Sequence, residues 1–354
     1  MSAVSSSPPS TAPALPPVLV RRQTGSGRVA LVLFAIAIIA LASMAWWAKT
    51  GTIRMMLELC CYIAVAQMWN MLAGYAGLVS VGQQAFMGAA GYALFVLAQT
   101  FGINPFLAIF LSLLVPAVLA VPCYMLLHRL DGPYFAIGTW VVAEVFRLVA
   151  SNMGFLNAGA GMSLGVMRDY SLFERNVAMS WLCAILILTT IGGSYWFLRS
   201  RYGLALIAMR DNPVAAASQG VNVPRLRFMI YIAAAVGCGL AGAIYSMAQL
   251  RINPPSAFDP MWASIAIFIV MVGGIASIEG VLIGSLIYFL ADRWFGEYGA
   301  SYFVVLGVMT VLVALYARGG IWGAVSKRWD VHWFPIRRNL TYTSQDTAKP
   351  EDKS

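Results

Sequence analysis

The stretch VALVLFAIAIIALASMAWWA, at residues 29–48, contains no charged side chain and is long enough to cross a bilayer as one helix of about 20 residues. No small-residue cleavage pattern follows it, so we expect a retained first helix rather than a signal peptide. Similar apolar runs, separated by polar breaks, follow along the chain and predict further spans. The expected spans are 29–48, 55–73, 84–101, 104–127, 133–150, 180–198, 228–249, 261–276, 278–295 and 301–317.

The composition agrees with a membrane protein. Of 354 residues, 60% are hydrophobic and 10% are charged, whereas soluble domains carry about 25% charged residues. The 32 Gly and 16 Pro fit membrane helices, where close packing favours small residues. The five cysteines all lie in apolar stretches without a CxxC pair, which indicates buried side chains rather than a metal site or disulfides. We predict an all-α polytopic transmembrane helical bundle.

The charge distribution predicts the orientation of this bundle. The net charge of +9 is interpreted as loop charge that fixes topology rather than as a nucleic-acid surface. With the N-terminus inside, most of the 23 basic residues fall on the inner side, and the segment 199–227 contributes most clearly. Its basic residues are Arg199, Arg201, Arg210, Arg225 and Arg227. We therefore expect both termini in the cytoplasm.

Motifs of catalysis and nucleotide binding are missing from the sequence. It has no GxxxxGK[ST] phosphate loop, no HExxH and no GxSxG, and His128 and His332 are too far apart to form a helical metal pair. Intramembrane clusters of His, Asp or Glu, which membrane enzymes usually show, are also missing. We therefore expect a chain that is not an enzyme and has no catalytic or metal residues.

The segment GYAGLVSVGQQAFMGAAGY, at residues 74–92, places glycines and polar side chains at membrane depth. Exposed backbone survives there only against protein or a water-filled path. Residues 74–82 are therefore expected to be partly unwound or re-entrant, which leaves the number of spans between eight and ten. One interpretation is a helix break that lines a solute pathway, and the other is glycine-mediated helix packing.

Two further features lie in expected spans. Glu144 and Arg147 are three residues apart on one helix and can pair across a turn, either as part of a pathway or as a structural ion pair. The segment GGIASIEGVLIG, at residues 273–284, shares a Gly-x-x-Ser step with the first glycine-rich segment. This step suggests an internal pseudo-repeat, as in many transporters.

The inner loop at residues 200–227 is unusually apolar. Residues 213–219 are Ala-rich and predict a short helix, with Asn212 as its cap, Pro213 in the first turn and Gly220 at its end. Such a helix between two spans suits docking on a cytoplasmic protein. The alternative, a solvated basic linker, would leave the apolar side chains between Leu204 and Met209 in water.

In this order, the features resemble the branched-chain amino-acid ABC transporter permease family over residues 29–323. The matching positions are Gly74, Gly77, Ser80, Gly82, Phe86, Gly88, Gly91, Tyr92, Gly132, Pro133, Tyr134, Phe135, Ala136, Ile137, Thr139, Glu144, Arg147, Ser200, Arg201, Gly203, Ala208, Arg210, Asn212, Ala215, Ala216, Gly220, Val221, Ala241, Gly242, Ala243, Gly273, Gly274, Gly280 and Gly284. The sequence departs from the family pattern at Gln83, Asp211, Ala276, Val281 and Ala317. Gln83 and Ala276 lie near the expected path, so these departures bear on the identity of the substrate.

The resemblance implies an importer subunit of the bacterial inner membrane. The expected organisation is a basic disordered tail at 1–28, a permease domain at 29–323 with a coupling loop at about 200–227, and a cytoplasmic tail at 324–354. The implied partners are two cytoplasmic ATP-binding subunits, a second homologous permease, a periplasmic solute-binding protein and membrane lipid, but no nucleic acid. The chain itself would hold no cofactor, because ATP binds to the partner subunits.

The resemblance also implies two sets of functional residues. The expected ATPase-coupling residues are Ser200, Arg201, Gly203, Ala208, Arg210, Asp211, Asn212, Ala215, Ala216 and Gly220. The expected translocation path contains Gly74, Gly77, Ser80, Gly82, Gln83, Glu144, Arg147, Gly273 and Gly274.

The implied substrates are branched-chain or related amino acids, and relatives carry other amino acids, short amides or urea. A sugar permease of the wider superfamily stays open, as does a secondary transporter. A secondary transporter would need a deep ion-coupling carboxylate, for which Glu144 is the candidate.

Overall fold

The computed structural model describes residues 18–21, 25–317, 319–329 and 339–342. Most of the tails predicted at 1–28 and 324–354 therefore lies outside the described residues. The helices are α1 (Gly25–Trp47), α2 (Thr50–Asn70), α3 (Gln83–Gln99), α4 (Pro105–Ser112), α5 (Leu114–Leu127), α6 (Pro133–Asn152), α7 (Leu172–Ile187), α8 (Gly193–Arg199), α9 (Arg201–Asp211), α10 (Pro213–Ser218), α11 (Val223–Gln249), α12 (Pro254–Ala257), α13 (Met261–Gly273), α14 (Ile278–Phe295), α15 (Ala300–Tyr316) and α16 (Gly320–Trp329). The π turns η1 (Met71–Tyr75) and η4 (Leu188–Gly192) extend α2 and α7, and η2 (Gly154–Gly159), η3 (Gly165–Asp169) and η5 (Gly296–Tyr298) are 3-10 turns.

The all-α membrane bundle is confirmed. Each expected span coincides with a helix or with consecutive helical segments. Within the described part of the chain, seven helices are long and apolar enough to cross a membrane, or eight if the bent pair Ser301–Tyr316 and Gly320–Arg328 is one span. Neither α3, with 17 residues, nor α14 is among the seven. The predicted number of eight to ten spans therefore agrees with the structure only at its lower limit of eight.

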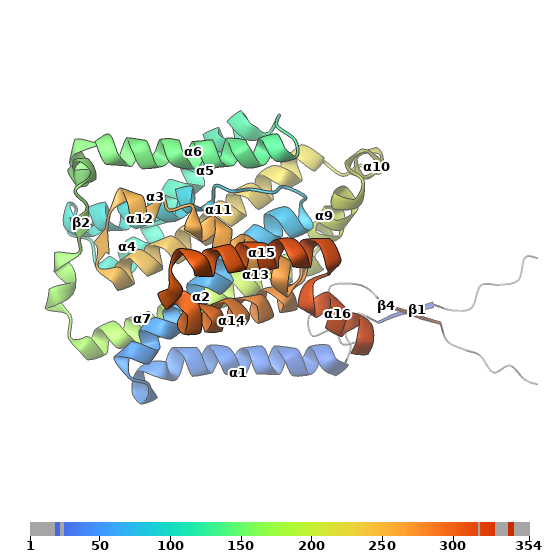
Figure 1. Ribbon diagram of the computed structural model, residues 1–354, viewed down its shortest axis with the longest axis horizontal. Helices are drawn as coiled ribbons and strands as arrows, with labels where there is room; N and C mark the ends of the chain where they lie inside the picture. The colour runs from blue at the N-terminus through green and yellow to red at the C-terminus, as the bar shows by residue number, and fades with distance from the viewer. Residues whose placement is uncertain (1–17, 22–24, 318, 330–338, 343–354) are drawn as a thin grey trace, which may run out of the picture.

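The helices α2 and α11 form the centre of the bundle. α11 packs along α3, α2 and α5, and α2 also contacts α7, α13 and α14. α1 lies along one long face and α6 along the opposite face (Figure 1). Both outer helices expose large apolar side chains, such as Ile39 of α1 and Val141 of α6, as helices in contact with lipid do.

Short strands and turns lie at the two ends of the bundle. The strand β2 (Met162–Ser163) pairs with β3 (Arg251–Ile252) at one end. The helices α9, α10 and α16 lie at the other end, together with the pair formed by β1 (Val18–Arg21) and β4 (Asn339–Tyr342) (Figure 1). The segments near the two chain termini thus share an end with α9 and α10. The five cysteines are free and buried, as predicted.

Glycines allow α3 and α11 to approach each other closely. A Cβ atom at Gly242 of α11 would overlap the backbone of Met87 in α3. At Gly237, also in α11, a Cβ would instead meet the flexible side chain of Met68. Only the first position therefore depends on glycine for the separation of two backbones.

We expect Gly242→Ala to destabilise the protein by about 1–3 kcal/mol or more, because overpacking forces backbone shifts. Gly237→Ala, the matched control on the same helix, should be tolerated, since the Met68 side chain can move. Thermal unfolding of the two purified variants in detergent checks this difference. Equal stability of the two variants would contradict the packing of α3 on α11.

Candidate functional site

The first helix break follows α2. The helix passes into the π turn η1, and residues 76–82 are neither helix nor strand before α3 begins at Gln83. Gly77 has a φ of 70°, a conformation that favours glycine. The sequence predicted a partly unwound segment at 74–82, and the structure confirms it.

The second break separates α13 from α14. Gly274 has a φ of 137°, and Ala276 a φ of 58° in the left-handed region. The Ser277 hydroxyl accepts a hydrogen bond from the Gly280 amide at 3.1 Å and caps α14. Ser80 does not cap α3, whose N-cap residue is Gly82. The shared Gly-x-x-Ser step thus lies at a helix break in both places, but its serine caps the next helix only in the second break. An internal repeat stays a prediction.

Asn70 joins the two breaks. Its side-chain oxygen accepts a hydrogen bond from the Ala276 amide at 2.8 Å, and its amide nitrogen donates to the Ser277 carbonyl at 3.1 Å. Asn70 is fully buried, and a Cβ at Gly74 would overlap its side chain. A buried amide with both ends satisfied fixes the position of one break relative to the other. The sequence analysis missed Asn70, although an amide at membrane depth is itself a signal.

Buried amides also surround the first break. Ser80, Gln83 and Gln84 are all buried, and the Ser80 hydroxyl donates to the Gln83 side-chain oxygen at 3.3 Å. The Gln83 amide nitrogen and the Gln84 side-chain oxygen have no partner among the described residues. Buried groups of this kind normally bind water or ligand. They give the break a set of unused hydrogen-bonding groups.

The helix α6 is tied to this break by Thr139. The Val81 amide donates to the Thr139 hydroxyl at 2.9 Å, and a Cβ at Gly82 would overlap the Thr139 carbonyl. The structure therefore places Ser80, Gly82 and Gln83 beside Thr139, whereas Gly74 lies against Asn70 and the Ala276 amide. Gly273 and Gly274 belong to the same region, because Asn70 accepts a hydrogen bond from Ala276 in the second break.

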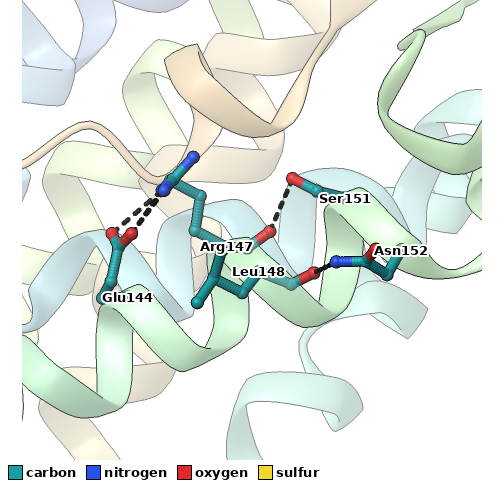
Figure 2. Close-up of polar contacts among 5 residues, drawn as sticks. All are labelled: Glu144, Arg147, Leu148, Ser151 and Asn152. Carbon is teal, nitrogen blue, oxygen red and sulfur yellow. Dashed lines mark hydrogen bonds and ion pairs between the residues drawn. The ribbon is translucent and has the colours of Figure 1, made fainter.

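The predicted pair of Glu144 and Arg147 is present on α6 (Figure 2). The Arg147 Nε donates to both carboxylate oxygens of Glu144, at 3.0 and 2.9 Å. Both side chains are partly exposed, 42% for Glu144 and 31% for Arg147, and they lie outside the contacts that join the breaks. A role of this pair in the path stays a prediction.

Removing one charge of this pair should destabilise the protein more than removing both charges. Glu144→Gln leaves Arg147 as an unpaired charge on a helix that faces lipid, which is unfavourable. The double variant Glu144→Gln/Arg147→Gln carries no charge there and should regain most of the stability. Thermal unfolding in nanodiscs checks this order, and a double variant less stable than the single one would contradict it.

The loop at 200–227 folds into two short helices. The Ser200 hydroxyl accepts a hydrogen bond from the Tyr202 amide and caps α9, and the Asn212 side chain accepts from the Val214 and Ala215 amides and caps α10. The Gly220 φ of 87° follows the end of α10. The predicted helix at 213–219 is thus confirmed, within one residue at its end. The sequence analysis missed α9.

α9 and α10 each have some side chains that are buried and others that are exposed. Leu206, Met209 and Ala216 are buried, whereas Leu204 and Val214 are exposed, Val214 to 79%. Gly203 is required where α9 begins, because a Cβ there would overlap the Leu198 carbonyl. The remaining predicted coupling residues, Arg201, Ala208, Arg210, Asp211, Asn212, Ala215 and Gly220, are exposed.

The α9–α10 segment contacts the first break directly. α9 packs on η1 and on α11. Both Arg210 and Glu279 lie close enough to the buried Tyr75 hydroxyl to act on it electrostatically. Glu279, buried in the first turn of α14, lies just after the second break. The exposed segment and the two breaks therefore form one connected region, and the sequence analysis missed the part of Glu279 in it.

Residues 51–315 match the family described as "Branched-chain amino acid transport system / permease component". The chain is 22% identical to the high-affinity branched-chain amino acid transport system permease protein LivM of Escherichia coli, covering 82% of this chain and 74% of LivM. It is 25% identical to a probable branched-chain amino acid transport permease protein LivH of Methanocaldococcus jannaschii, covering 68% and 82%. It is also 27% identical to the fructose import permease protein FrcC of Rhizobium meliloti, covering 60% and 62%.

The family match covers most of the chain, including both helix breaks and the α9–α10 segment. The chain is a multi-pass membrane protein and belongs to the family of branched-chain amino acid transport system permease components.

Proposed function

We propose that this chain forms half of the translocation path of an ATP-driven importer for branched-chain or related amino acids. The observation that carries the proposal is the contact of the exposed α9–α10 segment with η1, together with the Asn70 hydrogen bonds that join η1 to the second break. A force applied to α9 and α10 from outside is thereby passed to both breaks. This is the connection that an importer needs between a motor and a path.

The partners follow from this arrangement and from the family. Two cytoplasmic ATP-binding subunits would bind the α9–α10 segments of this chain and of a second homologous permease. ATP would be bound by those subunits, and this chain would hold no cofactor of its own. A periplasmic binding protein would deliver the solute at the opposite end, and both termini would lie in the cytoplasm.

The path would run beside the two breaks. Gly77 leaves its backbone exposed, whereas Gly74, Gly273 and Gly274 are buried and let the breaks pack closely. Ser80 and Gln83 supply polar groups. When the ATP-binding subunits close, α9 would press on η1 and shift the breaks relative to each other. Since Asn70 holds them together in the present geometry, we propose that its hydrogen bonds stabilise one of the two states of the path.

Reconstitution of the complete complex tests the proposal. The chain is co-expressed with its genomic neighbours and placed in proteoliposomes with ATP inside and binding protein outside. We expect ATP-dependent uptake of radiolabelled leucine, isoleucine or valine, and no comparable uptake of fructose or urea. Uptake of fructose or urea alone would replace the proposed substrate class, and uptake without ATP would indicate a secondary transporter.

A further inference from the structure

A cavity with a mainly apolar wall and three charged residues lies away from the helix breaks, between α2, α11 and α14. Its volume is about 270 Å³, and its lining includes Arg54, Met55, Glu58, Tyr245, Ala248 and Arg293. This is near the lower limit of pockets for small ligands, roughly 300 Å³ and above. Because Arg54 and Glu58 lie near the start of α2, the cavity is close to the end of the bundle opposite α9 and α10 (Figure 1).

Glu58 lies within a helix that is apolar and long enough to span a membrane. It is about two turns after the start of α2, inside the candidate span Thr50–Tyr75. The Tyr62 hydroxyl donates to its Oε1 at 3.0 Å, and its Oε2 has no hydrogen-bond partner among the described residues. An ionisable group at such a position is costly and usually functional.

Two guanidinium groups accompany this carboxylate without neutralising it. Arg54 precedes Glu58 by four residues, so their Cβ atoms lie about 5–6 Å apart on one helix face. Arg293 reaches the same cavity from α14. The ion pairs among the described residues are Glu144–Arg147 and Arg227–Asp131, so Glu58 is ion-paired with neither Arg54 nor Arg293.

The cavity therefore offers both signs of charge beside apolar walls. Met55, Leu57 and Ala248 are aliphatic, and the Tyr245 ring packs edge-on against Trp262 with 4.7 Å between ring centroids. A free α-amino acid has the complementary groups, since its ammonium suits a carboxylate, its carboxylate suits a guanidinium and its side chain suits the apolar wall. An uncharged sugar or urea has no charge to pair with Glu58, Arg54 or Arg293.

We propose that this cavity is an entry site for the zwitterionic head group of an amino acid. Glu58 binds the α-ammonium group, Arg54 and Arg293 bind the α-carboxylate, and the side chain lies against Met55 and Ala248. The proposal rests on the proposed function, since it names the class of solute that enters the path. It places selection for a free amino acid in this chain as well as in a binding protein.

Protection of a cysteine from labelling tests this site. Met55→Cys is introduced into the full-length chain in nanodiscs, where the native cysteines are buried. Labelling by a membrane-impermeant maleimide is timed with L-leucine, with leucinamide, which lacks the carboxylate, and with 4-methylpentanoate, which lacks the ammonium. Ser256→Cys, in a neighbouring cavity that also contains Tyr245, serves as the matched control, and Ala248→Cys is a second reporter if Met55→Cys does not fold.

We expect leucine at about ten times its Kd to slow labelling of Met55→Cys about tenfold, following the ratio of free to occupied sites. The two analogues should protect far less at the same concentration, and Ser256→Cys should stay unprotected. Adding Glu58→Gln should abolish protection by leucine, whereas Glu58→Asp should retain part of it. Equal protection by all three compounds, protection at Ser256→Cys, no protection by leucine, or full protection despite Glu58→Gln would overturn the assignment.

The uptake assay separates this inference from the proposed function. If the assembled complex imports leucine but leucine protects neither Met55→Cys nor Ala248→Cys, only the entry site is wrong. If leucine protects the cavity but the assembled complex imports no amino acid, the proposed function fails, and the cavity binds amino acids without being an entry site to a path.

Discussion

Val214→Glu is expected to release the ATP-binding subunits from the complex while the chain still inserts and folds. Val214 is 79% exposed in α10, so the substitution removes no contact of the bundle. At a docked surface, however, it would bury an unpaired carboxylate. Breaking a buried interface in this way costs several kcal/mol, which lowers affinity at least about 100-fold. Co-purification of tagged permease with the ATP-binding subunits measures this loss.

A matched substitution at the opposite end of the molecule controls for non-specific effects. Phe155→Glu introduces the same charge at an apolar residue that is 70% exposed in η2. It should leave co-purification unchanged. If both variants keep their ATP-binding subunits, α10 is not the docking helix, and if both lose them, the charge itself is responsible.

Asn70→Leu is expected to cause the largest loss among substitutions in the helix breaks. It would leave the Ala276 amide and the Ser277 carbonyl without their partner in a buried region. Each orphaned group costs about 1–3 kcal/mol, so we expect a destabilisation of about 2–6 kcal/mol. ATP-driven uptake should be lost as well, because the hydrogen bonds that stabilise one of the two states of the path would be missing.

Gln67→Leu supplies the control on the same helix. Gln67 is also fully buried in α2, but neither its side-chain nitrogen nor its oxygen has a partner among the described residues. Replacing a buried amide without partners by an apolar side chain of similar size should be neutral or stabilising. Thermal unfolding in detergent compares the two variants. If Asn70→Leu is as stable as Gln67→Leu, the Asn70 bridge does not hold the breaks together.

Most of the fold could be predicted from the sequence because apolar run length and polar interruptions directly reflect the bilayer. The glycines at 74–82 predicted the first break for the same reason, since uncovered backbone needs a special location in a membrane. The cap of α10 by Asn212 and Pro213 could also be predicted, because capping is local in sequence.

The contacts that connect these pieces could not be predicted. Asn70 bonds to residues more than two hundred positions away, and a lone amide in an apolar helix does not reveal its partner. Similarly, α9 lies on η1 through tertiary packing rather than through a sequence motif. The likeness of residues 273–284 to the first break indicated a second helix interruption. It did not indicate that the two interruptions are in contact.

Glu58 could not be predicted from the sequence for a different reason. It lies in an apolar run predicted as one span, and the sequence pattern indicated only Glu144 as an intramembrane carboxylate. The structure places the Glu144 pair at a partly exposed position and Glu58 in a cavity beside Arg54. Which ionisable group faces a cavity depends on helix rotation, which single-sequence periodicity in an apolar helix does not define.

The sidedness of α10 tests the central claim most directly. Ser218, exposed at the end of α10, is replaced by Cys in cells that express the importer with or without its ATP-binding subunits, and a membrane-impermeant maleimide is added to spheroplasts or to inside-out vesicles. The account predicts labelling in inside-out vesicles, reduced when the ATP-binding subunits are present, and none in intact spheroplasts. Labelling in intact spheroplasts would place α10 in the periplasm and contradict the proposed coupling to a cytoplasmic ATPase.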